Sequence, residues 1–378
     1  MKKILFLSYT NVFSGAESVL CDYLKENNIN ENYIYTTNTN YIIQEYEKYL
    51  EKDKIYISEK MNIVSIRKHP FVAIKNLLYN LYKINIIVRK NNIDILYGNN
   101  TLDIALLVLY KKYLNRNIKV VSHIHDIIDK KDYKKFFIEK YNKYVDKFIV
   151  PSIATKESLK LCNINNEKIE VVYNGIELHE DKKRQYNFIR EKFNINKDKK
   201  IICIIGQFCK RKRQDLFIDI VDCLNKKYNN KYVGIIIGKI TDKDFYEEMK
   251  LKIQDPILFI NDMKREEIFK YIYPNIDALI LLSDRDPLPT VILEAMSMKT
   301  IVIARNVDGV KEIILDQING FMIDYNFKIE ILSTLIEQVM NLNEKDKIKI
   351  KNNARKTIQE KFTLEIKKNI INDIINNL

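Results

Sequence analysis

Residues 200–208 read KIICIIGQF, and this run restarts a pattern that the chain has already used once. Before it, short β-rich runs alternate with longer amphipathic segments, from KILFLSY at residues 3–9 to IEVVYN at residues 169–174. Strands buried in parallel sheets read as nearly continuous apolar runs, and helices connect them. We therefore expect an α/β fold with two doubly wound parallel sheets.

The predicted strands fall into two groups separated by the strongly charged residues 180–200. The first group is KILFLSY (3–9), YIYTT (33–37), KIYIS (54–58), IDILYG (93–98), KVVSHI (119–124), KFIVPS (147–152) and IEVVYN (169–174). The second group is KIICIIGQF (200–208), YVGIIIGKI (232–240), PILFIND (256–262), IDALILLS (276–283), KTIVIAR (299–305) and GFMID (320–324). Because open parallel sheets bind ligands at the carboxyl ends of their strands, the pattern predicts a ligand cleft between two domains. From about residue 342 onward the chain is compatible with helix, with a break at Phe362 and Thr363.

Composition restricts the class of partner and the location. The net charge of +13 favours an anionic partner such as a membrane surface, a nucleic acid or a phosphorylated substrate. The five cysteines form no CxxC pair, which argues against a disulfide framework or a zinc site and favours the cytoplasm. The apolar part of MKKILFLSYT is too short for a signal peptide, and no run of about eighteen apolar residues occurs.

Residues 284–296, DRDPLPTVILEAM, place two acids around the expected start of a helix. A helix N-terminus has free amide hydrogens and a positive dipole end, so it suits an anion. Carboxylates beside it suit hydroxyl groups. The stretch is typical of a site for a ligand that carries both phosphate and sugar.

Two further loops follow predicted strands. The small residues of Ser14-Gly15-Ala16-Glu17 allow a ligand to approach backbone amides at a helix start, although an ordinary strand-to-helix turn has the same composition. After the strand at 200–205, residues 210–213 are four consecutive cations. Such a run is commonly a solvated surface, but its position between a buried strand and a helix favours phosphate binding.

Two of the four histidines lie at the end of one predicted strand. If the strand continues, His123 and His125 point to the same side. No further convincing ligand set accompanies them, so a metal site is disfavoured. Two interpretations stay open, a polar strand end satisfied by the backbone and a contact with substrate.

Taken in order, these motifs resemble the GT-B glycosyltransferases of family 4 over nearly the whole chain. The resemblance is carried by Ser14-Gly15-Ala16-Glu17, His125-Asp126, Val172-Tyr173-Asn174-Gly175-Ile176, Gly206 with Lys212, the acids Asp286 and Glu294, Asp308-Gly309-Val310-Lys311-Glu312 and Ile318-Asn319-Gly320. It implies two Rossmann-like domains, an acceptor-side domain at 1–175 and a nucleotide-sugar domain at 190–362. A last helix at about 363–378 is expected to pack back on the first domain.

The resemblance also implies roles for individual residues. Lys212 and the amides of Thr290 and Val291 would hold the donor diphosphate, Glu294 the ribose, and Asp286 the transferred sugar. His125, Asp286 and Lys212 are the expected catalytic residues. The remaining donor-side residues are Gly15, Gly206, Gln207, Arg211, Asn261 and Pro289. The remaining acceptor-side residues are Ser14, Ala16, Glu17 and Asp126.

Members of this family retain anomeric configuration, generally without a metal ion, so no cofactor is expected. The donor would be a UDP- or GDP-linked sugar, and the acceptor a hydroxyl of a glycan or lipid-linked molecule in bacterial surface polysaccharide or glycolipid synthesis. Three positions depart from the family pattern: Asp286 replaces the more frequent Glu, Gln207 stands where an Arg often lies, and Ser14 replaces a Gly. Two alternatives stay open, a catalytically silent partner subunit and a sugar-nucleotide epimerase of the same architecture.

Two basic stretches indicate where the first domain could meet a membrane. Residues 62–92 contain six Lys or Arg and no acid, interleaved with aromatic and aliphatic residues, and residues 129–147 contain seven lysines against four acids. Both compositions suit a peripheral contact with the anionic inner leaflet. The alternative is an amphipathic helix on the first sheet with a cationic solvent face. Nucleic acid is disfavoured, because no recognised binding motif accompanies the charge.

Overall fold

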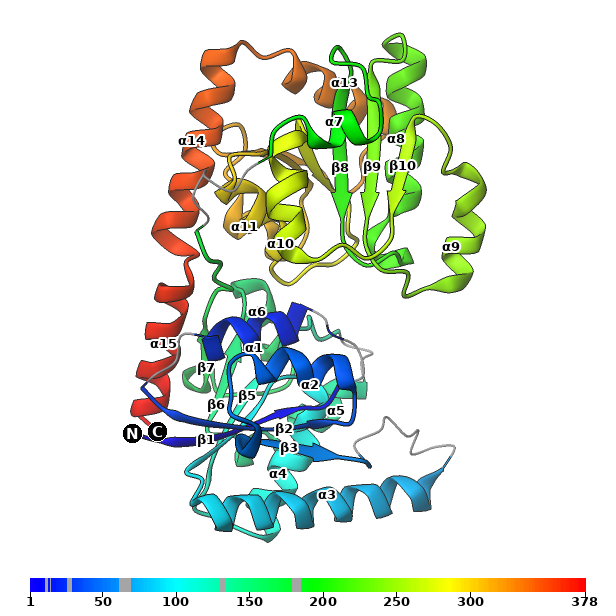
Figure 1. Ribbon diagram of the computed structural model, residues 1–378. Helices are drawn as coiled ribbons and strands as arrows, with labels where there is room; N and C mark the ends of the chain where they lie inside the picture. The colour runs from blue at the N-terminus through cyan, green and yellow to red at the C-terminus, as the bar shows by residue number, and fades with distance from the viewer. Residues whose placement is uncertain (11–12, 14, 26–28, 61–68, 130–132, 179–184) are drawn as a thin grey trace. The chain divides into compact units, whose positions relative to one another are not determined.

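The computed structural model describes residues 1–378 except 11–12, 14, 26–28, 61–68, 130–132 and 179–184 (Figure 1). The chain forms two compact units, which we call the first unit (Met1–Gly175 with Leu364–Leu378) and the second unit (Ile176–Thr363). Each unit is built on one parallel sheet with helices on both faces. The predicted α/β fold with two Rossmann-like domains is confirmed.

The sheet of the first unit has seven strands in the order β3-β2-β1-β4-β5-β6-β7. Its strands are β1 (Lys3–Ser8), β2 (Glu31–Thr37), β3 (Ile55–Ser58), β4 (Ile95–Gly98), β5 (Lys119–His123), β6 (Lys147–Val150) and β7 (Ile169–Val171). The order reverses at β1, which lies between β2 and β4 with Leu5 opposite Tyr33 on one side and Leu96 on the other. In sheets of this kind the reversal point marks the usual ligand position at the carboxyl ends.

Helices cover both faces of the first sheet (Figure 1). One face is covered by α3 (Pro70–Asn91), α4 (Ile104–Tyr113), α5 (Tyr133–Tyr141) and α6 (Ile153–Lys160), and the other by α1 (Gly15–Lys25), α2 (Asn40–Glu47) and α15 (Leu364–Asn376). Successive strand residues point to opposite faces, so Leu5 and Leu7 enter one core and Ile4 and Phe6 the other.

The sheet of the second unit has six strands in the order β10-β9-β8-β11-β12-β13. They are β8 (Lys200–Ile205), β9 (Tyr232–Ile237), β10 (Ile257–Ile260), β11 (Ala278–Leu281), β12 (Ile301–Arg305) and β13 (Phe321–Ile323). The helices are α7 (Phe188–Lys192), α8 (Gln214–Lys227), α9 (Lys243–Met249), α10 (Arg265–Glu267), α11 (Thr290–Ser297), α12 (Val310–Ile313), α13 (Ile329–Met340) and α14 (Glu344–Lys361). Helix α8 packs against α13, and α11 packs against α14.

The tail of the chain contributes to both units. Helix α14 ends at Lys361, and α15 begins at Leu364 after the predicted break at Phe362 and Thr363. Ile371 and Ile375 of α15 are buried in the core of the first unit, in one cluster with Phe6 of β1. The burial of this apolar face explains why the last helix belongs to the first unit.

Candidate active site

In the second unit, β8 and β9 are each followed by a glycine. Because glycine has no side chain, the two strand ends can approach each other. Gly206 and Gly238, which follow β8 and β9, both have φ near +150°. A Cβ at Gly238 would lie 1.8 Å from the Gly206 carbonyl oxygen, so no other residue fits there without movement. A Cβ at Gly206 would lie 3.4 Å from Cε of Lys212, which shows that the lysine side chain passes close over this backbone.

Lys212 is held by an ion pair with the first acid of residues 284–296. Its Nζ lies 2.6 Å from Oδ2 of Asp286, and the side chains are only 15% and 9% exposed. The loop that carries Asp286 is fixed from behind, because the Asp286 amide donates to Oδ2 of Asp308 at 2.8 Å and the Gly309 amide donates to the Asp286 carbonyl. Little water reaches the pair, so its electrostatic field is weakly screened.

The four cations at residues 210–213 differ in what they contact. Arg213 pairs with Asp215 and with Asp284, and Arg305 binds the same Asp284 carboxylate at 2.5 Å. The hydrogen bonds from Arg213 to Asp215 raise the pKa of its guanidinium above the ordinary value. By contrast, Arg211 is exposed and donates to the backbone carbonyl of Arg285. Arg213 therefore supports the loop, whereas Arg211 is exposed and Lys212 contacts Asp286, as the donor-site prediction requires of cations that have no further partner among the described residues of the loop.

Helix α11 begins at Thr290, directly after Pro289. No acid lies in its first turn, and Pro289 makes no side-chain cap. The helix cannot satisfy the amides of Thr290 and Val291, its first two residues, so two donors and the positive end of the dipole remain at this point. Both residues are partly exposed, and Asp286 lies three residues before Pro289. The start of α11 thus offers two amide donors close in sequence to a carboxylate, and anion binding there stays a prediction.

Glu294, the second acid, is buried inside α11 and is fully oriented by two residues that the sequence analysis did not single out. Arg265 donates from Nε to its Oε1 at 2.7 Å, and the Tyr273 hydroxyl donates to its Oε2 at 2.9 Å. Burial, together with Glu294, raises the pKa of Tyr273 well above its ordinary value, so its hydroxyl stays protonated and donates. Each carboxylate oxygen keeps a lone pair for a ligand hydroxyl.

Two predicted donor residues lie at the margin of this group. Gln207 accepts on its backbone carbonyl from the side chain of Gln214 at 2.9 Å, which fixes the turn after β8. Asn261 follows β10 and is exposed, and within the described residues it makes no hydrogen bond to the other predicted donor residues. Lys212, Asp286, Gly206 and the start of α11 therefore form the centre of the candidate site, with Glu294 on the same helix.

In the first unit, the side chains of the two histidines lie together, although β5 ends at His123 and does not continue to His125 as the alternation argument required. The rings of His123 and His125 lie 3.9 Å apart, and Nδ1 of His123 is 2.9 Å from the Tyr97 hydroxyl. Burial, and then the charge of Lys367, lowers the pKa of His125 to about 3, and burial holds the pKa of His123 well below its ordinary value. His125 is half-buried as a residue, and its Nε2 atom is on the buried side. Both rings are therefore neutral near pH 7.

Some buried polar atoms of the two histidines and of Asn99 lack a hydrogen-bond partner within the described residues. Within the described part of the chain, Nε2 of both histidines and Oδ1 of Asn99 are buried without a hydrogen bond. Buried polar atoms usually have a partner, and Asn99 and His123 line a cavity of about 10 Å³, which has room for one water at most. Lys367 of α15 lies beside them and donates to the Val19 carbonyl. A lysine that reaches this strand edge from the tail was not predicted.

The remaining acceptor-side predictions are placed as follows. Gly15 is exposed at the start of α1, and a Cβ added to it would meet no atom within 4 Å beyond its chain neighbours. The Ala16 carbonyl accepts from the Asn99 side chain at 3.1 Å, Glu17 is buried, and exposed Asp126 accepts from the Thr101 hydroxyl. Ser14 lies outside the described residues. The Asn99 side chain thus connects the start of α1, with Gly15 and Ala16, to the edge of the sheet where the histidines lie.

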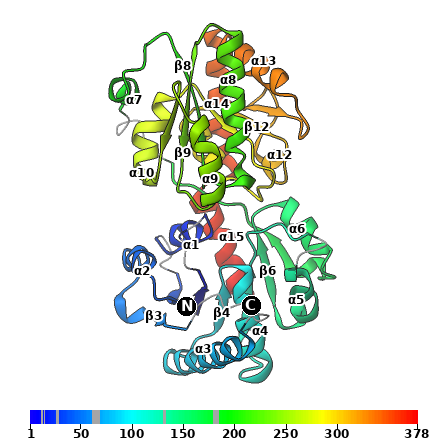
Figure 2. The same ribbon diagram turned by 90° about the vertical axis from the view of Figure 1, so that its right-hand side faces the viewer.

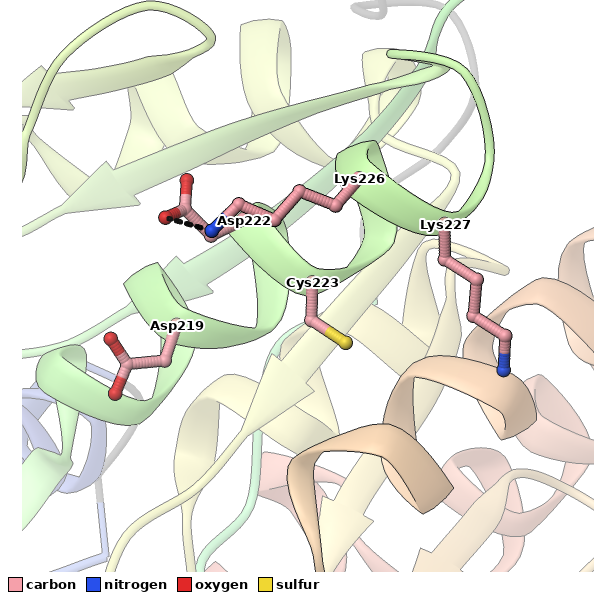
Figure 3. Close-up of a pocket in the computed structure, with 5 residues that line it drawn as sticks. All are labelled: Asp219, Asp222, Cys223, Lys226 and Lys227. Carbon is pink, nitrogen blue, oxygen red and sulfur yellow. Dashed lines mark ion pairs between the residues drawn. The ribbon is translucent and has the colours of Figure 1, made fainter.

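A hollow of about 440 Å³ on the outer side of α8 is a separate feature (Figure 3). It is lined by Asp219, Asp222, Cys223, Lys226 and Lys227. These residues belong to the part of α8 that runs away from the carboxyl ends of the strands, and Asp222 pairs with Lys226 at 3.8 Å. None of the predicted site residues lines this hollow, so we do not assign the site to it.

Two further absences concern the described ranges only. They contain no group of three His, Cys, Asp or Glu side chains that could hold a metal ion. None of their helices is both long enough and apolar enough to span a bilayer.

Comparison with known proteins shows which families the chain resembles. Residues 33–180 match the family model described as Glycosyltransferase Family 4, and residues 185–357 match the model described as Glycosyl transferases group 1. A stretch of 236 residues, 59% of this chain, is 26% identical to an uncharacterized glycosyltransferase of Methanocaldococcus jannaschii and spans 58% of that protein.

Two other matches extend the comparison. A stretch of 161 residues, 42% of this chain, is 24% identical to GalNAc-alpha-(1->4)-GalNAc-alpha-(1->3)-diNAcBac-PP-undecaprenol alpha-1,4-N-acetyl-D-galactosaminyltransferase of Campylobacter jejuni, over 44% of that protein. Among solved structures, HepE of Anabaena in complex with UDP and glucose matches over 100% of both chains with a TM-score of 0.83 and 17% identity. The chain thus resembles glycosyltransferases of family 4 and group 1 over residues 33–180 and 185–357, and the HepE structure has the same fold.

Proposed function

We propose that the protein transfers a sugar, with retention of anomeric configuration, from a UDP- or GDP-linked donor to a hydroxyl of a glycan or lipid-linked acceptor. The observation that carries this proposal is the buried Lys212–Asp286 ion pair, 2.6 Å long, at the close approach of Gly206 and next to the start of α11. In this proposal the cation would bind the diphosphate, and the carboxylate that contacts it would bind the sugar hydroxyls. The Campylobacter relative, whose name includes an undecaprenol-linked acceptor, favours surface glycan or glycolipid synthesis.

The leaving diphosphate would be held by fixed positive groups. Lys212 has three ammonium hydrogens and uses one on Asp286, so donors remain for phosphate oxygens. The amides of Thr290 and Val291 add two donors at a helix start, and exposed Arg211 adds a second cation. Groups that are already oriented stabilise developing charge without reorganisation, which is commonly the largest catalytic contribution.

The sugar and the ribose would be held by the two acids. Asp286 shares its charge with Lys212, so one of its oxygens is free to accept from a sugar hydroxyl when the lysine turns to the phosphate. Glu294, oriented by Arg265 and Tyr273, would accept from ribose hydroxyls. An orienting pair of donors of this kind makes the carboxylate rigid, which lowers the entropic cost of binding.

The reaction needs no protein nucleophile and no cofactor. The bond between the sugar C1 and the β-phosphate oxygen breaks, a bond between C1 and the acceptor oxygen forms on the same face, and the acceptor proton passes to the leaving phosphate. The low pKa of His125 keeps it neutral, so it would accept or donate a hydrogen bond to the acceptor or the sugar without adding charge.

A donor screen tests the proposal. The purified protein is incubated with UDP- and GDP-sugars, and the release of free UDP or GDP is measured with and without hydroxyl acceptors. We expect one donor to be consumed and the product to keep the anomeric configuration of the donor by NMR. Nucleotide-induced thermal stabilisation without turnover would instead indicate a silent subunit, and isomerised sugar nucleotide would indicate an epimerase. Inversion at C1 would contradict the retaining mechanism.

A further inference from the structure

Helix α3 is apolar on the side that faces away from the core. Phe71, Ile74, Leu78, Tyr82 and Ile86 are 86%, 54%, 61%, 63% and 41% exposed, and we call them the α3 stripe. Their spacing of three or four residues puts them in one line on the helix surface, about 22 Å long. Figures 1 and 2 both show α3 on the outside of the first unit.

The opposite side of the same helix is buried, so the stripe cannot turn inward. Ile84, Ile87 and Val88 are part of the core on one face of the first sheet. Asn80 fixes the rotation of the helix further, because its Oδ1 accepts from the hydroxyls of Tyr35 and Ser58, each at 2.6 Å. A helix that is apolar on both sides is normally covered on both sides, and here nothing in the described chain covers the stripe.

The charges on α3 have one sign. Residues 70–91 contain Lys75, Lys83, Arg89 and Lys90 and no Asp or Glu. Lys75 and Arg89 are exposed and fall on the same side of the helix as the stripe, while Lys83 lies over the ring of half-buried Tyr79. Helix α14 has a different surface: it is also basic, but it carries the acids Glu344, Asp346 and Glu360, and Ile348 is its exposed large apolar residue.

From these observations we propose that α3 docks on the surface of an anionic lipid bilayer, with the α3 stripe among the lipid chains and its cations on the headgroups. An apolar line flanked by cations without acids is complementary to a negatively charged interface. A second copy of the chain would bring another all-cationic helix against this one, which is electrostatically unfavourable. This proposal refines the predicted membrane contact at 62–92, of which residues 61–68 lie outside the described chain. It does not depend on the proposed reaction.

The second basic stretch, residues 129–147, is not needed for this surface. Residues 130–132 lie outside the described chain. On α5, Phe136 is 64% exposed, and Lys140 lies 5.5 Å from its ring. Since α5 is on the same face of the sheet as α3, Phe136 would add a contact to the same bilayer.

Vesicle flotation tests the proposal with the full chain. The protein is floated at low salt with vesicles of phosphatidylcholine, or of equal parts phosphatidylcholine and phosphatidylglycerol. We expect binding to the anionic vesicles only, weakened by high salt. The double variant Leu78→Asp/Tyr82→Asp should lower the bound fraction about tenfold or more. It loses the free energy that the apolar Leu78 and Tyr82 side chains gain when they move from water into the interface. Ile331→Asp, an equally exposed apolar position on α13 of the second unit, is the matched control and should float like the original protein.

If the stripe variant folds poorly, a variant that reverses two charges on α3 tests the proposal instead. Lys75→Glu/Arg89→Glu should also lose binding to anionic vesicles, whereas Lys345→Glu/Lys349→Glu on α14 should retain it. Failure of the original protein to float, or equal flotation of all variants, overturns the proposal. A dimer seen by sedimentation velocity without vesicles would also overturn the proposal if Leu78→Asp/Tyr82→Asp dissociated that dimer. The α3 stripe would then be an interface between two copies of the chain.

Discussion

The carboxyl edges of the two sheets carry opposite chemistry. At the edge of the second sheet, Lys212, Asp286, Arg265 and Glu294 form short ion pairs. At the edge of the first sheet, burial and the nearby charge of Lys367 keep His123 and His125 neutral, and their Nε2 atoms lack partners in the described chain. Charged, oriented groups suit a diphosphate, whereas neutral acceptors suit a hydroxyl. This difference underlies our proposal that the donor diphosphate binds to the second unit and that the histidine pair of the first unit contacts hydroxyl groups.

The largest effect should come from Lys212→Ala. It removes the buried cation from the charged edge, and loss of one oriented donor at developing charge commonly costs about 100- to 1000-fold in rate. The measurement is kcat/KM for nucleotide release with the donor found in the screen. Lys210→Ala, an exposed neighbour on the same turn, is the control and should stay within about twofold, as is usual for a surface charge.

This variant also leaves Asp286 buried without its partner, which could lower activity through instability. The double variant Lys212→Ala/Asp286→Asn removes that charge and should recover thermal stability but not activity. Recovery of activity in the double variant would show that Lys212 acts only as a structural partner of Asp286.

The close approach of Gly206 and Gly238 should be the next most sensitive point. Gly238→Ala forces a Cβ to within 1.8 Å of the Gly206 carbonyl at a φ of +152°, so the free energy of unfolding of the second unit should fall by about 2–4 kcal/mol. Denaturant unfolding measures it. Gly15→Ala provides the control in the first unit, because a Cβ there meets open space and the change should stay within about 0.5 kcal/mol. Similar losses in both variants would contradict this difference between the edges.

Glu294→Gln should have a smaller effect, and on binding in particular. The amide keeps the shape of the side chain but loses the charge that pairs with Arg265 and attracts ribose hydroxyls, so KM for the donor should rise about tenfold with a smaller change in kcat. Tyr273→Phe removes one of the two bonds that orient Glu294 and should raise KM less. An unchanged KM in Glu294→Gln would remove Glu294 from the ribose site.

Much of the fold could be predicted from the sequence, because strands and helix starts are marked by the types of residues that are neighbours in the chain. Each predicted strand is present, since strands buried on both faces must be apolar throughout. The start of α11 at Thr290 was likewise marked by Pro289 directly before an apolar run. Both signals depend on neighbouring residues, so no knowledge of tertiary packing was required.

The partners inside the candidate site depend on tertiary packing and were not predicted. Lys212 and Asp286 were each assigned to the donor site, but their pairing joins residues 74 positions apart. Arg265 and Tyr273 reach Glu294 from a different part of the chain, and their types are common on any helix. Lys367 comes from the tail helix, whose sequence shows only an amphipathic pattern. The family resemblance located the acids, while only the structure shows what orients them.

The smallest expected effect concerns the histidine pair of the first unit. It is a dependence of the free energy of unfolding on pH. The pKa of His125 is about 3 in the folded chain and near 6.5 when unfolded, so the unfolded chain binds more protons between these values. Stability from this group is complete above about pH 6.5 and is lost as the pH falls toward 3. The pKa of His123 shifts in the same direction. Between pH 7 and 5 the free energy of unfolding should therefore decrease, by about 1 kcal/mol from His125 after allowing for its partial exposure, with a further decrease from His123.

Replacement separates this effect from other titrating groups. His125→Asn should give a flatter dependence between pH 7 and 5, because the group that protonates only in the unfolded chain is gone. His69→Asn, at an exposed histidine before α3, should keep the original slope. The readout is denaturant unfolding of the first unit at several pH values. Equal slopes in all three proteins would mean that the histidine pair accepts protons in the folded state, and the contrast between a charged donor edge and a neutral acceptor edge would then not hold.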